Sequence, residues 1–221
     1  MLRFLMENSM PARMLALSTL FMFALPVLRA QFAPPPPATR VNDAGALQPP
    51  TGAKVAIIEF EDLECSDCAR ANPMLMDAAA KYGIPWVKHD FPLPFHKWSF
   101  EAAINARWFD TNSKAVGDEY RNEVFAHQPS IVDPAGLRAF TEKFAKAHNL
   151  VLPANVDPNG ELTEKVKADY ALGQKVGVEH TPTIWVVTAN SKGAPFVEVV
   201  DRMRLDEMIQ QALAETGEGR K

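Results

Sequence analysis

Residues 55–68 read Val-Ala-Ile-Ile-Glu-Phe-Glu-Asp-Leu-Glu-Cys-Ser-Asp-Cys, and this stretch says more about the fold than any other. The β-branched run over residues 55–60 predicts a short buried strand. Residues 69–82 have a helical composition, and Gly83 marks the end of that helix. We therefore expect Cys65 to lie at the N-terminal end of a helix that directly follows a strand.

Cys65 and Cys68 are the only cysteines in the chain. Two cysteines placed at random would have this spacing about one time in a hundred, which indicates that the pair is selected. A disulfide across so short a loop adds little stability, because the stabilisation grows with loop length. At a helix start, the dipole and free N–H groups lower the pKa of the first cysteine. This favours Cys65 as a nucleophile and Cys68 as the resolving thiol of a disulfide exchange.

The rest of the chain predicts an α/β fold with a helical insertion. A second strand is expected at residues 84–90, two more at 183–188 and 196–200 around a turn at 190–193, and a last helix at 205–214. Four candidate helices lie between these strands, at residues 97–110, 114–127, 134–148 and 161–176. The first strand–helix–strand passage implies parallel pairing, and the end of the chain implies a hairpin. Together they predict a mixed sheet flanked by helices.

Composition limits the classes of function. The chain has 221 residues, is 47% hydrophobic and 23% charged, and carries a formal net charge of -4. These values suit one soluble domain of medium size with extensions. No long basic block is present, which argues against nucleic acid as a partner.

The N-terminal region has the pattern of an export segment. Arg3 and Arg13 precede an almost wholly apolar run over residues 14–28, which predicts a signal peptide over residues 1–30. Met10 is an alternative start to Met1. Because Leu28 fits a cleavage site poorly, an uncleaved N-terminal anchor is the alternative. Export predicts a periplasmic or otherwise extracytoplasmic location, where disulfides form readily.

Proline-rich sequence follows the export segment. Residues 31–52 contain Pro34–Pro37 and Pro49–Pro50, which predicts an extended linker with little order. The folded domain is then expected at residues 53–215, with the helical insertion at about 95–176 and a flexible tail at 216–221.

Metal binding by the two cysteines is the main alternative to redox chemistry. A closed zinc site would need two histidines beside them, and no two histidines have the H-x3-5-H spacing. An exported copper carrier is the form of this alternative that we retain. The five histidines are His89, His96, His127, His148 and His180.

Three motifs together resemble a known family. They are residues 58–68 with the cysteine pair, residues 90–93 (Asp-Phe-Pro-Leu) followed by His96, and residues 177–183 (Gly-Val-Glu-His-Thr-Pro-Thr). Over residues 53–215 the chain resembles the DsbA-like branch of the thioredoxin superfamily. The resemblance implies a thioredoxin-like fold in which a cis-proline loop faces the cysteine pair. It also implies disulfide exchange with exported proteins, using the cysteine pair and no other cofactor, and a membrane redox partner that regenerates it.

The resemblance assigns roles to further residues. Pro182 matches the cis-proline, and Thr181 matches the preceding residue, which touches the active-site sulfur and bound substrate. Glu59 matches a buried acid that manages the proton of the resolving cysteine, because a desolvated carboxyl group can relay protons near neutrality. A harmless proline at the start of a strand and an exposed acid at the end of one remain the alternatives.

Two features depart from the family. Ser66 and Asp67 stand between the cysteines, where strongly oxidising members often carry a histidine that helps hold the thiolate. The Asp67 charge is expected to disfavour ionisation of Cys65, which predicts a less acidic thiol and a less oxidising disulfide. His180 stands where relatives often have glycine. It either supplies a proton or cation to Cys65 or, as we favour, is a surface histidine that shapes substrate contact.

Other polar and aromatic residues receive structural roles. Glu61, Asp62 and Glu64 make the approach to the cysteines acidic, and we expect their charges to be solvated. His96 is expected to cap or pack against a helix. The four tryptophans are expected in the core or at a domain interface. They are Trp86, Trp98, Trp108 and Trp185.

These observations predict an exported thiol–disulfide oxidoreductase that introduces disulfides into protein substrates. A disulfide reductase or isomerase of the same fold is the first alternative. A non-enzymatic metal-binding protein and a thioredoxin-like binding or structural module are the others.

Overall fold

The computed structural model describes residues 47–189, 197–199 and 201–217. The predicted signal peptide or anchor, most of the predicted linker, the turn at 190–193 and residues 218–221 lie outside the described residues. Within the described part of the chain, no helix combines the length and the apolar character that a membrane span requires.

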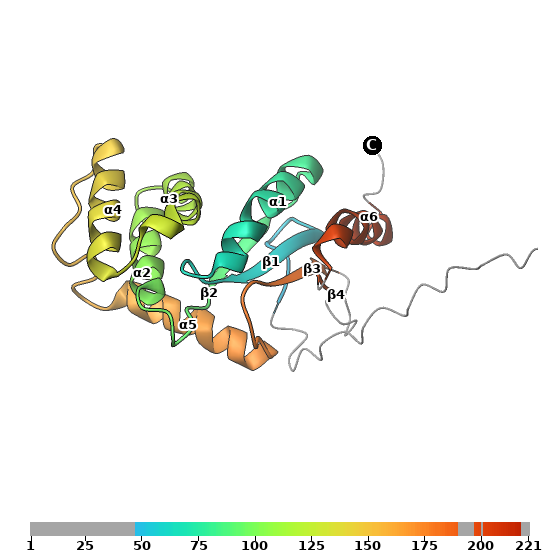
Figure 1. Ribbon diagram of the computed structural model, residues 1–221. Coiled ribbons are helices and arrows are strands. Elements are labelled where there is room, and N and C mark those ends of the chain that lie inside the picture. The colour runs from blue at the N-terminus through green and yellow to red at the C-terminus, as the bar shows by residue number, and fades with distance from the viewer. Residues whose placement is uncertain (1–46, 190–196, 200, 218–221) are drawn as a thin grey trace, which may run out of the picture. The chain divides into compact units, whose positions relative to one another are not determined.

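The element order matches the sequence-based prediction closely (Figure 1). The strands are β1 (Val55–Glu61), β2 (Trp86–Asp90), β3 (Thr183–Thr188) and β4 (Val197–Glu198). The α-helices are α1 (Ser66–Tyr82), α2 (Ser99–Asp110), α3 (Lys114–His127), α4 (Pro134–Ala147), α5 (Glu161–Val176) and α6 (Leu205–Glu215). Short 3-10 turns follow α3 at Gln128–Ser130 and precede α6 at Arg202–Arg204.

The sheet is mixed, as predicted, with the strand order β2-β1-β3-β4. β1 pairs in parallel with β2, as the strand–helix–strand passage implied, and antiparallel with β3. β3 and β4 form the antiparallel pair expected near the end of the chain. β2 begins two residues later than predicted. Pro85 precedes it, and the Pro85 carbonyl accepts a hydrogen bond of 2.9 Å from the Ile57 N–H.

β1 is buried along its whole length because both faces of the sheet are covered. On one face, Val55 and Ile57 pack with α1 and α6. On the other, Ile58 and Phe60 pack with Trp185 and the end of α5. The end of β1 that leads into α1 therefore holds the approach to the cysteines in a fixed position.

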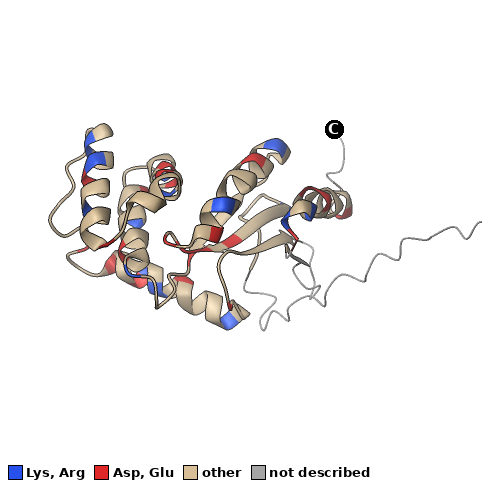
Figure 2. Ribbon diagram, in the orientation of Figure 1, with Lys and Arg blue, Asp and Glu red and all other residues tan. Residues whose placement is uncertain are grey.

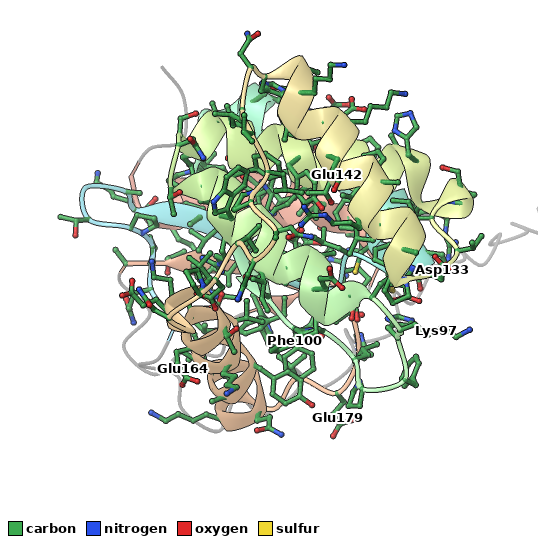
Figure 3. All side chains as sticks on the ribbon, turned by 90° about the vertical axis from the view of Figure 1, so that its left-hand side faces the viewer. Lys97, Phe100, Asp133, Glu142, Glu164 and Glu179 are labelled. Carbon is green, nitrogen blue, oxygen red and sulfur yellow. The ribbon has the colours of Figure 1, made fainter. Side chains whose placement is uncertain are left out.

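Helices α2–α5 occupy the segment between β2 and β3, which we call the insertion. They gather on the side of the sheet away from α6 (Figure 1), and Figure 3 views this side with Phe100 labelled on α2, Glu142 on α4 and Glu164 on α5. The insertion has an aromatic core of its own, in which Phe109 contacts Tyr120 and Phe144 with ring centroids 4.6 and 4.9 Å apart. Cys68 belongs to the same cluster of buried residues, so this core reaches the cysteine pair.

The boundaries of the folded part are wider than predicted. Leu47, assigned to the linker, is only 1% exposed and packs with Ile58 and Trp185. Thr216, assigned to the tail, is 8% exposed and donates a hydrogen bond of 3.1 Å to the Ala212 carbonyl. Leu47 is a single large apolar residue close to prolines, so the sequence gives no pattern that marks it as part of the core. The last turn of α6 extends beyond the last residue of its apolar pattern.

A buried group of charges joins the sheet to the insertion. Arg121 on α3 is 1% exposed, and its guanidinium lies 3.2 Å from Glu61 on β1 and 3.1 Å from Asp110 on α2. Arg107 on α2 pairs with Asp90 on β2 and with Asp169 on α5. The expectation that Glu61 is solvated is therefore wrong, because an arginine sixty positions further along the chain covers it.

Candidate active site

Cys65 is the N-cap residue of α1, as the sequence predicts for the first cysteine. β1 ends at Glu61, and a tight turn follows in which the Cys65 N–H donates a hydrogen bond of 3.0 Å to the Asp62 carbonyl. The Ala69 N–H in turn donates to the Cys65 carbonyl at 3.1 Å. The sulfur therefore lies among the N–H groups of the first turn of α1, which have no partner within the helix.

The surroundings of Cys65 strongly favour its thiolate. A hydrogen bond from the Cys68 thiol is the largest effect that lowers the pKa of Cys65, to about 5. The Thr181 hydroxyl and the backbone N–H groups of Cys68 and Asp67 lower this pKa further, while partial burial opposes them. At neutral pH, Cys65 is therefore a thiolate in the reduced protein.

Cys68 has the opposite environment. It is fully buried, and both cysteines are free thiols in this structure. Burial raises the pKa of Cys68 well above its usual range, and its hydrogen bond to Cys65 and the nearby Glu59 charge raise it further. The pair thus combines a partly exposed nucleophile with a protonated thiol behind it.

The loop opposite Cys65 carries Thr181 and Pro182. The Thr181–Pro182 peptide bond is cis, as the resemblance implied. When it is protonated, the Cys65 thiol donates a hydrogen bond of 3.3 Å to the Thr181 carbonyl. The Thr181 hydroxyl is buried and has no other hydrogen-bond partner among the described residues, so the Cys65 thiolate is the acceptor available to it.

Glu59 lies on β1 and is only 1% exposed, as the apolar neighbours of this residue predicted. Its carboxylate accepts a hydrogen bond of 2.9 Å from the Trp86 indole N–H. Burial and the charge of Glu61 raise the pKa of Glu59 well above its usual range. Two residues along the same strand, burial raises the pKa of Glu61 to about 7, although Arg121 opposes the shift.

The two residues between the cysteines occupy the start of α1. Ser66 is exposed, and the Asp67 carboxylate lies 2.6 Å from Arg70 and 3.4 Å from Arg202. Acidic residues gather around this end of α1, with basic residues close by (Figure 2). Slight burial opposes the shift, but the hydrogen bond from Arg70 and the charge of Arg202 lower the pKa of Asp67. The expectation that Asp67 destabilises the thiolate is not supported, because two guanidinium groups balance its charge.

His180 is exposed on the loop before Pro182. Its carbonyl accepts a hydrogen bond of 2.6 Å from the Thr183 hydroxyl, and its ring Nδ1 lies 3.5 Å from the same oxygen. This position agrees with a surface histidine at the rim of the site.

Sequence reasoning missed a second pair of residues at the site. His96 Nδ1 lies 2.8 Å from a carboxylate oxygen of Asp62, and the Asp62 side chain is fully buried. Glu64 accepts hydrogen bonds from the Trp98 and Ser99 N–H groups, at 2.7 and 3.1 Å, where α2 begins. The expectation that Asp62 is solvated is therefore wrong, whereas Glu64 remains partly exposed. The sequence shows acidic residues before the cysteines and a histidine shortly after the Phe-Pro-Leu-Pro motif. No local pattern indicates that Asp62 and His96 are in contact, because they are 34 positions apart.

The arrangement can perform thiol–disulfide exchange. It places a stabilised thiolate at the surface, a second thiol directly behind it, and a peptide carbonyl from a facing loop beside it. Among the residues that the structure describes, no three histidine, cysteine or acidic side chains lie close enough together to hold a metal ion.

The fold and the site define a thioredoxin-fold protein with a paired-cysteine centre. A family model described as thioredoxin matches residues 50–202, so the chain belongs to this family. No protein with a curated description matches the sequence.

Solved structures of DsbA-like proteins share the fold. BdbD from Bacillus subtilis aligns with a TM-score of 0.60 and 20% identity, over 77% of this chain and 91% of that one. The thiol-disulfide exchange protein alpha-DsbA2 from Wolbachia pipientis gives 0.57 and 15%, over 74% and 84% of the two chains. A periplasmic thioredoxin-like protein from Salmonella enterica serovar Typhimurium gives 0.58 and 18%, over 76% and 88%.

Proposed function

We propose that this protein is an exported thiol–disulfide oxidoreductase that introduces disulfides into protein substrates through Cys65 and Cys68. The observation that supports the proposal most strongly is the contrast between the two sulfurs. Cys65 is partly exposed with a pKa of about 5, whereas Cys68 is buried and stays protonated. A structural cysteine pair has no need of such a contrast.

In the oxidised protein, a substrate thiolate attacks the Cys65 sulfur, and the Cys65–Cys68 bond breaks. Cys68 leaves as a thiolate and takes up a proton, for which the nearby Glu59 carboxyl is a source. A second substrate thiolate then attacks the substrate sulfur of the mixed disulfide and releases Cys65 as a thiolate. The substrate has lost two electrons, and the cysteine pair has gained them. Thr181 and Pro182 lie beside Cys65, where they can contact the bound substrate segment.

The proposed direction rests on the stability of the reduced form. A thiol that ionises well below neutral pH stabilises the dithiol protein, which makes its disulfide a better oxidant. Cys65 is also a good leaving group in the mixed disulfide for the same reason, so the substrate disulfide is released readily.

Export is supported by the sequence pattern of residues 1–30 and by the periplasmic relative of the same fold. Residues 31–46 would then act as a spacer before the folded domain. A membrane redox partner that withdraws electrons from the reduced cysteine pair completes the cycle, because each turnover leaves the protein reduced.

The proposal is tested by mixing the oxidised protein with a reduced peptide that contains two cysteines. We expect stoichiometric peptide oxidation and a parallel reduction of Cys65 and Cys68, and no reaction with a Cys65→Ser variant. An Asp77→Asn variant, changed on the far part of α1, is the matched control and should retain the wild-type rate. Failure of the wild-type protein to oxidise the peptide would refute the proposal.

A further inference from the structure

Asp62 contacts both cysteines through its backbone. Its carbonyl accepts a hydrogen bond of 3.0 Å from the Cys65 N–H, and its own N–H donates to the Cys68 sulfur at 3.5 Å. The position of the Asp62 peptide therefore determines how a donor is presented to the buried sulfur. This donor opposes the effect of burial on the pKa of Cys68.

The Asp62 carboxylate is fixed by hydrogen bonds on both of its oxygens. One carboxylate oxygen accepts a hydrogen bond of 2.7 Å from the Glu64 N–H. The other accepts from the Leu93 N–H at 2.6 Å and lies 2.8 Å from His96 Nδ1. Because the side chain is fully buried, these donors replace water as the partners of the carboxylate.

His96 belongs to the loop that leads into α2. Its side chain is 18% exposed, and the exposed Phe95 ring packs edge-on against it at 4.7 Å. In Figure 3 the next residue, Lys97, points outward from this loop. The hydrogen bond to Asp62 needs a proton on Nδ1, which the imidazolium and one neutral tautomer both carry.

We propose that Asp62 and His96 position the Asp62 N–H on the Cys68 sulfur, where this amide stabilises the thiolate that Cys68 becomes during exchange. The inference rests on the proposed function and adds a group to its mechanism. The Asp62 N–H touches a reacting atom, whereas the Asp62 carboxylate and His96 act through it as positioning groups. The Asp62 N–H acts only in the step in which Cys68 attacks or leaves as a thiolate, because it contacts the Cys68 sulfur and not the Cys65 sulfur.

The chemistry balances in either direction. When the reduced protein reacts with a disulfide, Cys65 attacks first and releases one sulfur as a thiolate. Cys68 then gives up its proton, for which the nearby Glu59 carboxylate is an acceptor, and attacks the Cys65 sulfur. The bond between Cys65 and the substrate breaks, and the second substrate sulfur leaves as a thiolate. In the reverse reaction Cys68 is the leaving thiolate, so the same amide assists it.

The test separates the two steps. Reduced protein is mixed with oxidised glutathione, and samples are quenched by acid so that the mixed disulfide at Cys65 can be counted by mass. We expect His96→Ala to slow the conversion of mixed disulfide to the Cys65–Cys68 disulfide about tenfold, the effect of weakening one hydrogen bond to a charged group. Formation of the mixed disulfide should stay within about twofold of the wild-type rate, because Asp62 contacts only the backbone N–H of Cys65 and not its sulfur.

Two further variants give the experiment its controls. His96→Asn keeps an N–H donor near the place of Nδ1 and should restore resolution to within about threefold of wild type. His148→Ala removes a histidine of similar exposure that pairs with Glu119 on the insertion, and both steps should be unchanged.

Each outcome decides the matter. Unchanged resolution in His96→Ala, or an equal slowing of both steps, would overturn the positioning role while leaving the proposed function intact. If His96→Asn resolves the mixed disulfide as slowly as His96→Ala, the positioning role is also overturned, because loss of the hydrogen bond to Asp62 would then not explain the slow resolution. If the wild-type protein forms neither a mixed disulfide nor the Cys65–Cys68 disulfide, the proposed function itself fails.

Discussion

Replacing Cys68 with alanine tests the main cause of the acidity of Cys65. In the reduced protein the Cys68 thiol is the strongest contributor to the low pKa of Cys65, which lies at about 5. A hydrogen bond to a charged group is worth about 1.5–3 kcal/mol, and about 1.4 kcal/mol corresponds to one pKa unit. Loss of this donor should therefore raise the pKa of Cys65 by about one to two units.

The assay is a thiolate titration. Absorbance at about 240 nm, or the rate of alkylation by iodoacetamide, is followed against pH in the Cys68→Ala variant. We expect a midpoint between about 6 and 7, against about 5 in the wild-type protein. Because the Thr181 hydroxyl and the N–H groups of α1 remain, the pKa should stay below that of an ordinary thiol.

A Cys68→Ser variant is the matched control. Its hydroxyl group keeps a donor in nearly the same place, so its Cys65 pKa should lie within about half a unit of the wild-type value. The reasoning would be refuted if Cys68→Ala titrated like the wild-type protein, or if the serine and alanine variants shifted equally.

Three other predictions follow from the site and its support. Arg121→Leu leaves Glu61 buried without its cation, so the free energy of unfolding measured in urea should fall by about 3–5 kcal/mol. Adding Glu61→Leu should recover part of this stability, and an unchanged free energy of unfolding in Arg121→Leu would contradict the buried ion pair. Asp67→Asn should move the pKa of Cys65 by less than about half a unit, because two arginines already balance the Asp67 charge. A larger fall of this pKa in a thiolate titration would show that Asp67 does destabilise the Cys65 thiolate. The Cys65 pKa is depressed in the folded reduced protein, so the free energy of unfolding of the reduced protein, relative to the oxidised protein, should rise with pH from about 5 to about 8.5. The gain should be about 2 kcal/mol at pH 7 after solvent screening and should vanish below pH 5. A difference in unfolding free energy that does not vary with pH would argue against a stabilised thiolate.

The fold was largely predictable because local patterns carry it. The apolar run of β1, Gly83 after α1 and the prolines between the insertion helices each mark an element within a few residues of where it lies. The placement of Cys65 at a helix start follows from the same local signals. The boundaries were less predictable, since the burial of Leu47 depends on contacts with the sheet and with the end of α5.

The electrostatics of the site were the least predictable part. The sequence shows four acids around the cysteines but not their partners. Glu61 is covered by Arg121 on α3, and Asp67 is balanced by Arg202, which lies 135 positions away along the chain. Because the sign of each effect on Cys65 depends on such distant cations, a count of neighbouring charges predicted a less acidic thiol than the structure supports.

The reduction potential of the Cys65–Cys68 pair, measured against pH in a glutathione buffer, tests the central claim most directly. A Cys65 pKa of about 5, compared with about 7 in thioredoxin, should place the potential at pH 7 near −220 mV, about 50 mV above thioredoxin. The potential should fall by about 30 mV per pH unit between pH 6 and 8, since only Cys68 then takes up a proton on reduction, and by about 59 mV per unit below pH 5. A potential at or below about −270 mV, with a slope near 59 mV per unit at neutral pH, would contradict the stabilised thiolate on which this account rests.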